Sequence, residues 1–391
     1  MTTTPLTVFL VAGEPSGDLL GARLMVGLKA IADRPVLFVG VGGERMVAEG
    51  LDTLFPMAEL ALFGVLELLP KLPRLIARLN QTVAAVRTIK PDVVVTIDSP
   101  GFTFRIGKRL RHGAQAMRDI PLIHYVAPTV WAWRPERARK IAAFLDHLLV
   151  LLPFEPPWFE REGLSCTFVG HSIIESGAGR GDGAGFRSRH GLSPEDRVLV
   201  VLPGSRTTEL RRLLPDFKAT LALLAPRYPN LVAVVPTLSH VADTVRKAVA
   251  GWPVRVIVTE GDTEKYDAFA AGAAALAASG TVALELALAR LPAVIAYRLN
   301  PLTHALYRHL IQTKFVNLVN IMHDRALVPE LLQDNCKPAK LAQEISRLLD
   351  DPAARLAQIE GLDAVERWLG AGGMAPSRRA AEVVWRLAVA N

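Results

Sequence analysis

Short apolar runs rich in valine, isoleucine and leucine alternate along the chain with longer segments of helical periodicity, and turns containing glycine, proline or serine separate them. This alternation is typical of parallel sheets covered by helices on both faces, because such strands have no solvent side that would call for polar positions. The pattern forms two successive series. The first predicts strands at Thr7–Ala12, Val36–Val41, Asp92–Ile97, Pro121–Val126, Leu148–Leu152 and Thr167–Val169, and the second at Arg197–Leu202, Leu231–Val235, Val254–Val258, Ala273–Ala278 and Ala293–Tyr297.

The stretch Glu175–Asp196 separates the two series and is rich in glycine, serine and alternating charge. We interpret it as a linker with an entry turn, and predict domains of residues 1–175 and 176–391, with the last helices able to pack back on the first domain. A chain of 391 residues also exceeds what one core usually organises. The expected fold class is α/β, with two Rossmann-like domains whose parallel sheets face each other across a cleft, an arrangement known as GT-B.

Composition narrows the classes of function. Cys166 and Cys336 lie far apart and have no cysteine or histidine near them at metal-ligand spacing, so we expect neither a disulfide framework nor a zinc site. The net charge of +7 suits an anionic partner, yet no zinc-finger spacing, RNP-like strand or long basic block favours nucleic acid. The Asp-x-Asp motif that holds a metal-bound diphosphate in many transferases is missing, so we expect no metal and no cofactor.

Two apolar stretches bear on membranes. Ala268–Ala289 is interrupted by Ser279, Gly280 and Thr281, which indicates a strand, a turn and a helix rather than a membrane span. Met57–Pro70 is apolar except for Glu59 and Glu67 and is followed by cations, a pattern that fits either an internal helix or docking on an anionic bilayer. No basic segment precedes the first apolar run, so we expect no signal peptide and a cytoplasmic protein.

Ligands of open parallel sheets bind beyond the carboxyl ends of the strands, where loops meet helix N-termini. The loop that follows the strand Arg197–Leu202 contains Gly204, Ser205 and Arg206. Glycine permits close approach of a ligand to the backbone, and a guanidinium fork suits phosphate oxygens. The alternative is an ordinary turn with a solvated arginine, and the motif alone does not decide between them.

Ser279, Gly280 and Thr281 form a second such loop, which opens a helix whose only charged residue is Glu285. Burial of a lone carboxylate costs several kcal/mol unless a partner offsets it. Glu285 lies one helical turn beyond Thr281, so it could accept hydrogen bonds from a ribose diol while the helix N-terminus faces a diphosphate. The alternative is an ion pair with an internal cation.

Asp98 ends an apolar strand in the first half, where a rigidly mounted carboxylate could act as a general base. An Asx turn or a helix cap explains an aspartate at this position equally well. The segment Gly13–Asp18 places two carboxylates in a tight glycine turn that opens a helix, which is more than capping requires.

Together these segments give the chain a strong similarity to the lipid-A-disaccharide synthase family over nearly its whole length. The motifs that carry the resemblance are Val11–Asp18, Phe38–Gly43, His124–Arg134, Leu202–Arg206 and Ala278–Glu285, and they occur in the family's order. The resemblance implies an inverting transfer of 2,3-diacylglucosamine from its UDP derivative to the 6-hydroxyl of 2,3-diacylglucosamine 1-phosphate, which yields the β-1,6-linked disaccharide phosphate and UDP.

The resemblance also implies roles for individual residues. Asp98 becomes the general base. The donor-binding residues become Gly204, Ser205, Arg206, Ser279, Gly280, Thr281, Glu285, Tyr297 and Asn320, and the residues near the acceptor or the reacting centre become Glu14, Ser16, Gly17, Asp18, Trp133 and Arg134.

Acylated substrates imply a peripheral protein at the inner membrane, docked through Met57–Pro70 and through Lys108, Arg109 and Arg111. A metal-free UDP-sugar epimerase of the same architecture is the alternative enzyme, and a nucleotide-sugar or lipid-binding module is the non-catalytic alternative. A homodimer is left open.

Overall fold

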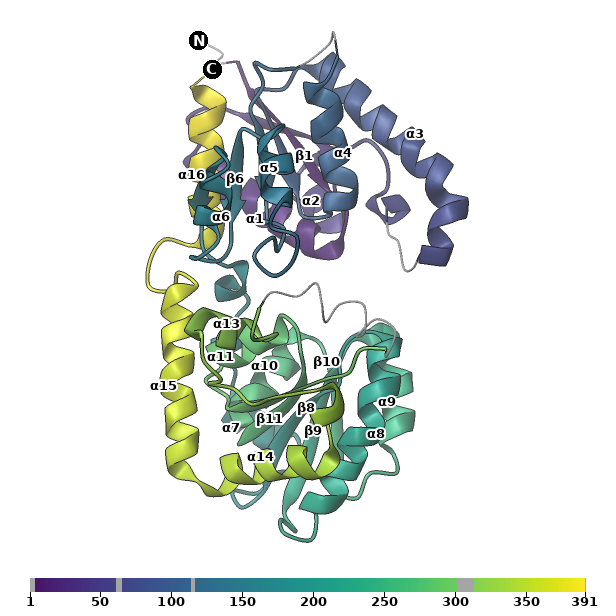
Figure 1. Cartoon of the computed structure of the whole chain (residues 1–391), viewed down its shortest axis with the longest axis vertical. Coiled ribbons are helices and arrows are strands. Elements are labelled where there is room, and N and C mark those ends of the chain that lie inside the picture. The colour runs from purple at the N-terminus through teal and green to yellow at the C-terminus, as the bar shows by residue number, and fades with distance from the viewer. Residues whose placement is uncertain (1–3, 61–64, 114–116, 301–312, 391) are drawn as a thin grey trace. The chain divides into compact units, whose positions relative to one another are not determined.

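The computed structural model describes residues 4–60, 65–113, 117–300 and 313–390 (Figure 1). The chain divides into two compact units, Met1–Ser172 with Leu369–Asn391 and Ile173–Trp368. Within the described residues, no helix combines the length and the apolar character needed to cross a bilayer.

The first unit is a parallel sheet with the strand order β3-β2-β1-β4-β5-β6-β7. Its strands are β1 (Leu6–Ala12), β2 (Val36–Val41), β3 (Leu51–Thr53), β4 (Val93–Ile97), β5 (Leu122–Tyr125), β6 (His147–Val150) and β7 (Ser165–Phe168). Its helices are α1 (Pro15–Ile31), α2 (Glu44–Ala48), α3 (Val65–Ile89), α4 (Pro100–Arg111), α5 (Arg137–Ala142), α6 (Pro156–Glu160) and α16 (Pro376–Val389).

Alternate residues of β1 build the cores on the two faces of this sheet. Leu6, Val8 and Leu10 pack with α1 and α16, whereas Phe9 and Val11 pack on the other face with α3 and α4. This division follows from the two-residue period of side chains along a strand. The sheet is therefore buried on both faces, as the apolar runs predict.

The second unit is a parallel sheet with the order β10-β9-β8-β11-β12-β13. Its strands are β8 (Arg197–Leu202), β9 (Leu231–Thr237), β10 (Arg255–Glu260), β11 (Ala274–Ala278), β12 (Ala293–Tyr297) and β13 (Glu330–Leu332). Its helices are α7 (Gly183–Arg189), α8 (Thr207–Leu224), α9 (Ala242–Val249), α10 (Asp262–Ala271), α11 (Val282–Leu288), α13 (Leu318–His323), α14 (Pro338–Asp350) and α15 (Pro352–Trp368).

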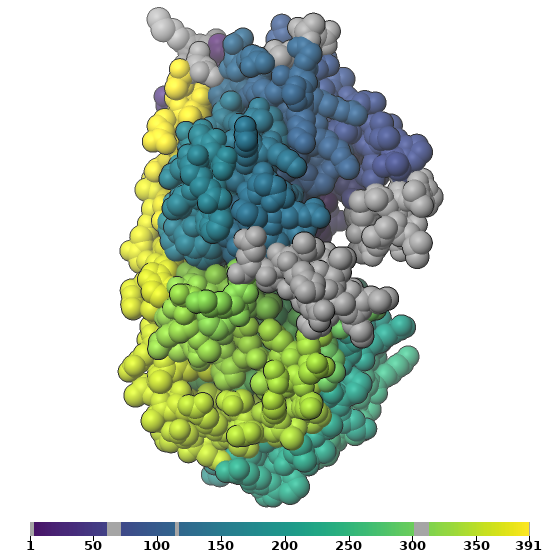
Figure 2. All heavy atoms as spheres, in the orientation of Figure 1, coloured from purple at the N-terminus to yellow at the C-terminus, as the bar shows by residue number. Residues whose placement is uncertain are grey.

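Figure 2 shows which segments form the visible surface of each unit. The blue and teal segment from α4 to β7 forms much of the first unit's visible face, and the yellow-green segment from α13 to α14 forms much of the second unit's.

The two parallel-sheet α/β domains predicted from the sequence are confirmed, and every predicted strand is present with small shifts of its ends. The sequence prediction missed β3 and β13, which are short strands at the edges of the two sheets. A three-residue strand is too short to show a period, so only its pairing with a neighbour identifies it.

The stretch Glu175–Asp196 is not the linker that its composition indicated. It contains α7, which packs on α10, and the Asp182 backbone N–H donates to the Asp267 carboxylate at 2.7 Å. A Cβ at Gly181 would lie 2.0 Å from the Tyr266 carbonyl oxygen, so this glycine serves close packing rather than flexibility. The division between the units accordingly falls earlier, at Ser172.

The C-terminal helix α16 belongs to the first unit, where it packs against α1 (Figure 1). A Cβ added to Gly27 of α1 would lie 2.9 Å from the Ala381 Cβ and 3.0 Å from the Ser377 carbonyl oxygen. The absence of a side chain at Gly27 therefore lets the two helix backbones approach closely.

Candidate functional site

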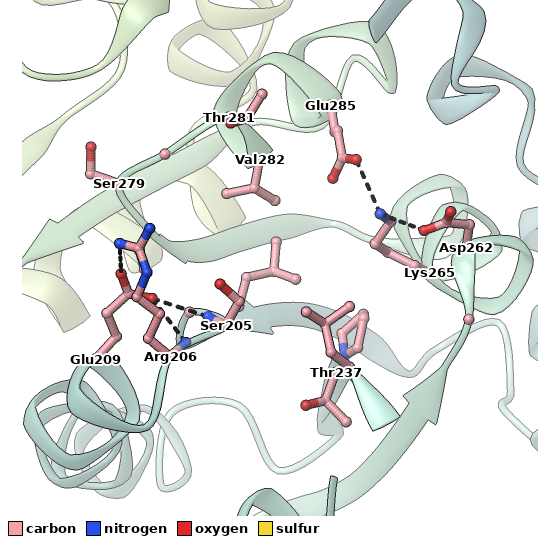
Figure 3. A pocket seen from close by; sticks show the side chains of 17 residues that line it. Ser205, Arg206, Glu209, Thr237, Asp262, Lys265, Ser279, Thr281, Val282 and Glu285 are labelled. Carbon is pink, nitrogen blue, oxygen red and sulfur yellow. Dashed lines mark hydrogen bonds and ion pairs between the residues drawn. The ribbon is translucent and has the colours of Figure 1, made fainter. Parts of the chain in front are cut away.

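A pocket of about 380 Å³ opens at the carboxyl ends of the strands of the second sheet (Figure 3). The loops that follow β8, β9, β10 and β11 all contribute to it, and β8 and β11 adjoin where the strand order reverses. Such a reversal is where open α/β sheets bind ligands, because the loops on its two sides diverge. The residues that line the pocket are Leu202, Gly204, Ser205, Arg206, Glu209, Pro236, Thr237, Leu238, Gly261, Asp262, Lys265, Ala278, Ser279, Gly280, Thr281, Val282 and Glu285.

The loop after β8 is held by Glu209, in the first turn of α8. Its carboxylate accepts hydrogen bonds from the backbone N–H groups of Ser205 at 3.0 Å and Arg206 at 3.3 Å. Gly204 has a φ of +106°, and a Cβ there would lie 2.4 Å from the Glu209 carboxylate, so only glycine fits. The Arg206 guanidinium contacts Glu209 at 3.4 Å but stays largely exposed, and it can therefore turn toward an anion in the pocket.

Glu285, on α11, is held on one side by residues of α10. Its Oε1 accepts hydrogen bonds from Lys265 Nζ at 3.0 Å and from the Tyr266 hydroxyl at 3.2 Å. Lys265 also pairs with Asp262 at 2.9 Å, so it lies between two carboxylates (Figure 3). Burial lowers the pKa of Lys265, but the Glu285 charge and the Asp262 hydrogen bond outweigh burial and raise the pKa above its usual value. Lys265 therefore stays charged. Both hydrogen bonds of Glu285 with the described residues are to Oε1, which leaves Oε2 available to a ligand.

Most of the donor-binding residues implied by the resemblance meet at this one pocket. They are Gly204, Ser205, Arg206, Ser279, Gly280, Thr281 and Glu285. Sequence reasoning missed Lys265 and Asp262, although the rule on strand ends could have found them. The loop after the predicted strand Val254–Val258 leads directly to Gly261 and Asp262, and α10 places Lys265 one turn later.

Tyr297 and Asn320 do not line the pocket that the described residues form. Tyr297 ends β12 beside β13. Asn320 is fully buried, and its side-chain oxygen accepts from the Leu327 and Val328 backbone N–H groups at 2.9 Å each. Its side-chain nitrogen donates to the Val328 carbonyl and to the Glu330 carboxylate. In this structure Asn320 fixes the segment that leads into β13 rather than facing a ligand.

In the first unit, Asp98 lies at the carboxyl end of β4, where the strand order also reverses. Asp98 and Ser99 both adopt left-handed backbone conformations, with φ of 49° and 47°, which is uncommon for residues other than glycine. The Thr103 hydroxyl stabilises this turn by donating to the carbonyl oxygens of both residues, at 2.8 and 3.0 Å. Strained backbone of this kind often occurs at functional sites, where the surrounding structure must hold it.

The segment Gly13–Asp18 approaches the same turn. The Ser16 hydroxyl contacts the Asp98 carboxylate at 3.4 Å, and both Glu14 and Ser16 are exposed. Gly17 is buried, and a Cβ there would lie 3.4 Å from the Ile97 carbonyl oxygen, so α1 runs close against β4.

The Asp18 carboxylate is engaged by backbone groups of the first unit. It is buried, and its carboxylate accepts hydrogen bonds from backbone N–H groups at the start of α2: Gly43 at 2.8 Å, Arg45 at 3.1 Å and Met46 at 3.1 Å. A carboxylate at this position satisfies the free N–H groups of a helix N-terminus. Asp18 therefore joins α1 to α2 and is a structural residue.

Trp133 and Arg134 belong to the turn after β5, and the Arg134 guanidinium stacks on the Trp133 ring with 4.7 Å to its centroid. Trp131 of the same turn is buried, and its indole N–H donates to Glu155 at 3.2 Å. Burial raises the pKa of Glu155 to about 7, although the Leu152, Trp131 and Leu151 N–H donors favour its charged form and lower the pKa. Glu155 therefore anchors the turn that carries Trp133 and Arg134.

The cations predicted to dock on a membrane differ in exposure and in their hydrogen-bond partners. Arg111 is only 9% exposed, and its guanidinium bonds to Asp146 and to the Ile120 carbonyl oxygen. It is a structural cation, so its predicted docking role is wrong. Lys108 is exposed, and Arg109 bonds to the Asn80 side chain. Of the predicted docking stretch Met57–Pro70, residues 61–64 lie outside the described residues.

The family model and the curated relatives that match this chain all name the same family. The chain matches the family described as "Lipid-A-disaccharide synthetase" over residues 8–370. A lipid-A-disaccharide synthase of Rhodospirillum centenum is 63% identical over 380 residues, which cover 97% of this chain and 94% of that protein. The synthase of Paramagnetospirillum magneticum is 52% identical over 381 residues, which cover 97% of each protein.

Among solved structures, the chain resembles the UDP-GlcNAc 2-epimerase of Neisseria meningitidis bound to UDP-GlcNAc, with a TM-score of 0.61, 12% identity and 99% coverage of both chains. It also resembles the calicheamicin glycosyltransferase, with a TM-score of 0.59, 17% identity and coverage of 97% of this chain and 98% of that one. At such low identity these similarities concern the fold alone.

The buried hydrogen bonds of Asn320 predict that Asn320→Ala destabilises the protein by about 2–4 kcal/mol, because the substitution leaves buried donors and an acceptor without partners. Urea unfolding monitored by circular dichroism would measure the loss. Asn335→Ala, at an exposed position of the same unit, should change stability by less than about 0.5 kcal/mol. An Asn320→Ala protein as stable as the unaltered one would return Asn320 to the ligand-binding candidates.

Proposed function

This chain belongs to the lipid-A-disaccharide synthase family, and we propose that it transfers 2,3-diacylglucosamine from its UDP derivative to the 6-hydroxyl of 2,3-diacylglucosamine 1-phosphate. The products are the β-1,6-linked disaccharide 1-phosphate and UDP. The observation that carries the proposal is the family match over residues 8–370, within which the second unit has a pocket lined by both an exposed guanidinium and a carboxylate.

The pocket suits a nucleoside diphosphate as donor. The Glu285 Oε2 atom is available to accept hydrogen bonds from ribose hydroxyls, and Arg206 is exposed and able to reach a diphosphate. Lys265 offsets the charges of Asp262 and Glu285, which would otherwise repel an anionic donor. We therefore assign donor binding to the second unit.

We assign the acceptor to the first unit and the general base to Asp98. The Asp98 carboxylate takes the proton of the acceptor 6-hydroxyl as the oxygen bonds to the anomeric carbon of the donor. The bond from that carbon to the diphosphate oxygen breaks, and UDP leaves with the electron pair. A single displacement inverts the anomeric configuration. Positive charge near the diphosphate stabilises the leaving group, which is the role we propose for Arg206.

A UDP-sugar epimerase is the other enzyme class to weigh, because its members share the fold. Relatives of 63% and 52% identity over nearly the full chain are synthases, whereas the epimerase resemblance is 12% identical and concerns the fold. An epimerase would consume UDP-diacylglucosamine without an acceptor, so incubation of the donor alone distinguishes the two reactions.

Asp98→Asn should lower the turnover number by about 10²–10⁴-fold, because an amide cannot accept the proton of the acceptor hydroxyl. UDP affinity should stay unchanged, since Asp98 and the pocket belong to different units. UDP release in the presence of both substrates measures the turnover. Asp52→Asn, an exposed carboxylate on β3, serves as the control and should retain normal turnover. Near-normal turnover of Asp98→Asn would remove Asp98 from the base role.

Glu285→Ala should weaken UDP binding by about 10- to 100-fold, because it removes the carboxylate that we propose binds the ribose hydroxyls. Isothermal titration calorimetry with UDP measures the effect directly. Glu344→Ala on α14, outside the pocket, is the matched control and should bind UDP normally. Equal affinities of the Glu285→Ala and control proteins would place the ribose elsewhere.

The acylated substrates lead us to propose a peripheral protein on the cytoplasmic face of the inner membrane. Leu72 and Ile76 lie one turn apart on α3 and are 38% and 44% exposed. Arg74 between them is 65% exposed and pairs with Glu59 at 2.9 Å. Apolar side chains flanked by a cation are typical of surfaces that insert into an anionic bilayer.

The variant Leu72→Asn with Ile76→Asn should bind anionic vesicles several-fold more weakly, because it removes exposed apolar surface. Cosedimentation at low and high salt would measure binding. Ile89→Asn, at the other end of α3 and 37% exposed, is the control. If the double variant and the control sediment alike, α3 is not the docking surface.

A further inference from the structure

Two arginines and one tryptophan form a cluster in the first unit, in the turn after β5 and at the start of α5. The Arg134 guanidinium lies 4.7 Å from the centroid of the Trp133 ring, and the Arg137 guanidinium lies 5.7 Å from it. A backbone hydrogen bond of 3.0 Å from Arg137 to Arg134 closes the turn between them. Both guanidinium groups therefore gather around one aromatic ring.

Neither guanidinium forms a hydrogen bond or an ion pair with the part of the chain that the structure describes. Several other arginines of the same unit have acidic partners: Arg78 binds Glu59 at 2.7 Å, and Arg111 binds Asp146. The exposed Glu136 lies between the two in sequence, but its side chain pairs with neither. The cluster thus keeps two sets of guanidinium donors available to a ligand.

The turn that carries the cluster is rigidly attached to the sheet. Trp131 donates its indole N–H to Glu155 and packs edge-on against Phe154 with ring centroids 5.1 Å apart. The other oxygen of Glu155 accepts the Leu151 and Leu152 backbone N–H groups at 3.1 and 3.0 Å. Ligand-binding side chains gain affinity when the backbone that carries them is fixed before binding.

The cluster also lies at the same edge of the sheet as Asp98. Strands β4 and β5 are parallel neighbours, and the Asp98 backbone N–H donates to the Tyr125 carbonyl at 2.9 Å at their common end. The turn after β5 therefore begins beside the Asp98 turn. A sugar bound at this edge can present a hydroxyl to Asp98 and another substituent to the arginines.

Planar guanidinium groups match phosphate oxygens through paired hydrogen bonds, and stacking on tryptophan leaves their N–H edges directed outward. We propose that Arg134 and Arg137, supported by Trp133, bind the phosphate monoester of the acceptor sugar. This inference rests on the proposed function, because it takes the acceptor to be a sugar 1-phosphate. It makes the cluster a specificity site: phosphate binding at one end of the acceptor orients its 6-hydroxyl at the other.

Arg134→Gln and Arg137→Gln test the proposal with two acceptors, diacylglucosamine 1-phosphate and diacylglucosamine without the phosphate, both in a nonionic detergent. Each variant should bind the phosphorylated acceptor about 10- to 100-fold more weakly in equilibrium titrations without donor, because each loses charged hydrogen bonds. Binding of the unphosphorylated acceptor should stay unchanged. Arg139→Gln, on the exposed side of α5, is the matched control and should behave as the unaltered protein.

Equal losses of affinity for both acceptors would show a general structural role of the arginines and overturn the proposal. Equal affinities of the unaltered protein for the two acceptors would overturn it as well. Cosedimentation with anionic vesicles in the absence of acceptor separates the other source of phosphate, the lipid headgroups. The variants should sediment normally, and lost sedimentation with intact acceptor binding would assign the arginines to the bilayer instead. Acceptor binding is measured without donor, so the test of the phosphate site does not depend on sugar transfer. If the protein bound the phosphorylated acceptor more tightly but transferred no sugar, the proposed function would be wrong and the phosphate-site proposal would still stand.

Discussion

Burial of both sheet faces is the constraint on which the sites of this protein depend. The first sheet packs α1 and α16 on one face and α3 and α4 on the other, and its strands β1, β2 and β4 carry no charged side chain. Polar and charged groups can then meet a ligand only at the ends of the strands, where loops leave the core. Asp98, the cluster of Arg134, Trp133 and Arg137, and the pocket of the second unit all lie at such ends.

Charge balance within the pocket explains how carboxylates and an anionic ligand could share one site. Glu209, Asp262 and Glu285 line the pocket together with Arg206 and Lys265. Each carboxylate is engaged: Glu209 with the loop backbone, and the other two with Lys265. Lys265 is thereby committed to neutralising its neighbours, whereas Arg206 makes only one long contact and remains available. We therefore propose different tasks for the two cations: Lys265 holds the pocket together, and Arg206 binds the ligand.

Several side chains that were expected to contact a substrate or a membrane make structural contacts instead. Asp18 caps α2, Asn320 fixes the segment before β13, and Arg111 is buried against Asp146. Each is a polar residue that satisfies backbone groups in the interior, and a buried polar group of this kind is as costly to replace as a ligand contact. Loss of activity on mutation would therefore not separate the two roles, whereas unfolding measurements do.

Local pattern was sufficient for every strand except β3 and β13, for the parallel class of both sheets and for most of the pocket. Within the pocket, β8 and β11 are apolar runs that lead into the loops of Gly204 and Gly280. Motif similarity, and not periodicity, identified the substrates. The strand-end rule could have located Lys265, but the interactions of Lys265 and Glu155 were not accessible in this way, since each depends on a partner from a distant segment: Glu285 for Lys265 and Trp131 for Glu155.

The sequence alone determined where the strands lie and which loops reach the ligand edge, because a strand's period and the turn residues that end it are local properties. Only the tertiary structure decided which polar side chains remain available at that edge. Asp18 and Arg206 both look like exposed charges at the start of a helix. In the structure, however, the Asp18 carboxylate accepts hydrogen bonds from the backbone of α2, whereas the Arg206 guanidinium stays largely exposed. The reason is that the hydrogen-bond partners of a polar side chain come from residues that the fold brings together in space, and their spacing along the chain does not identify them.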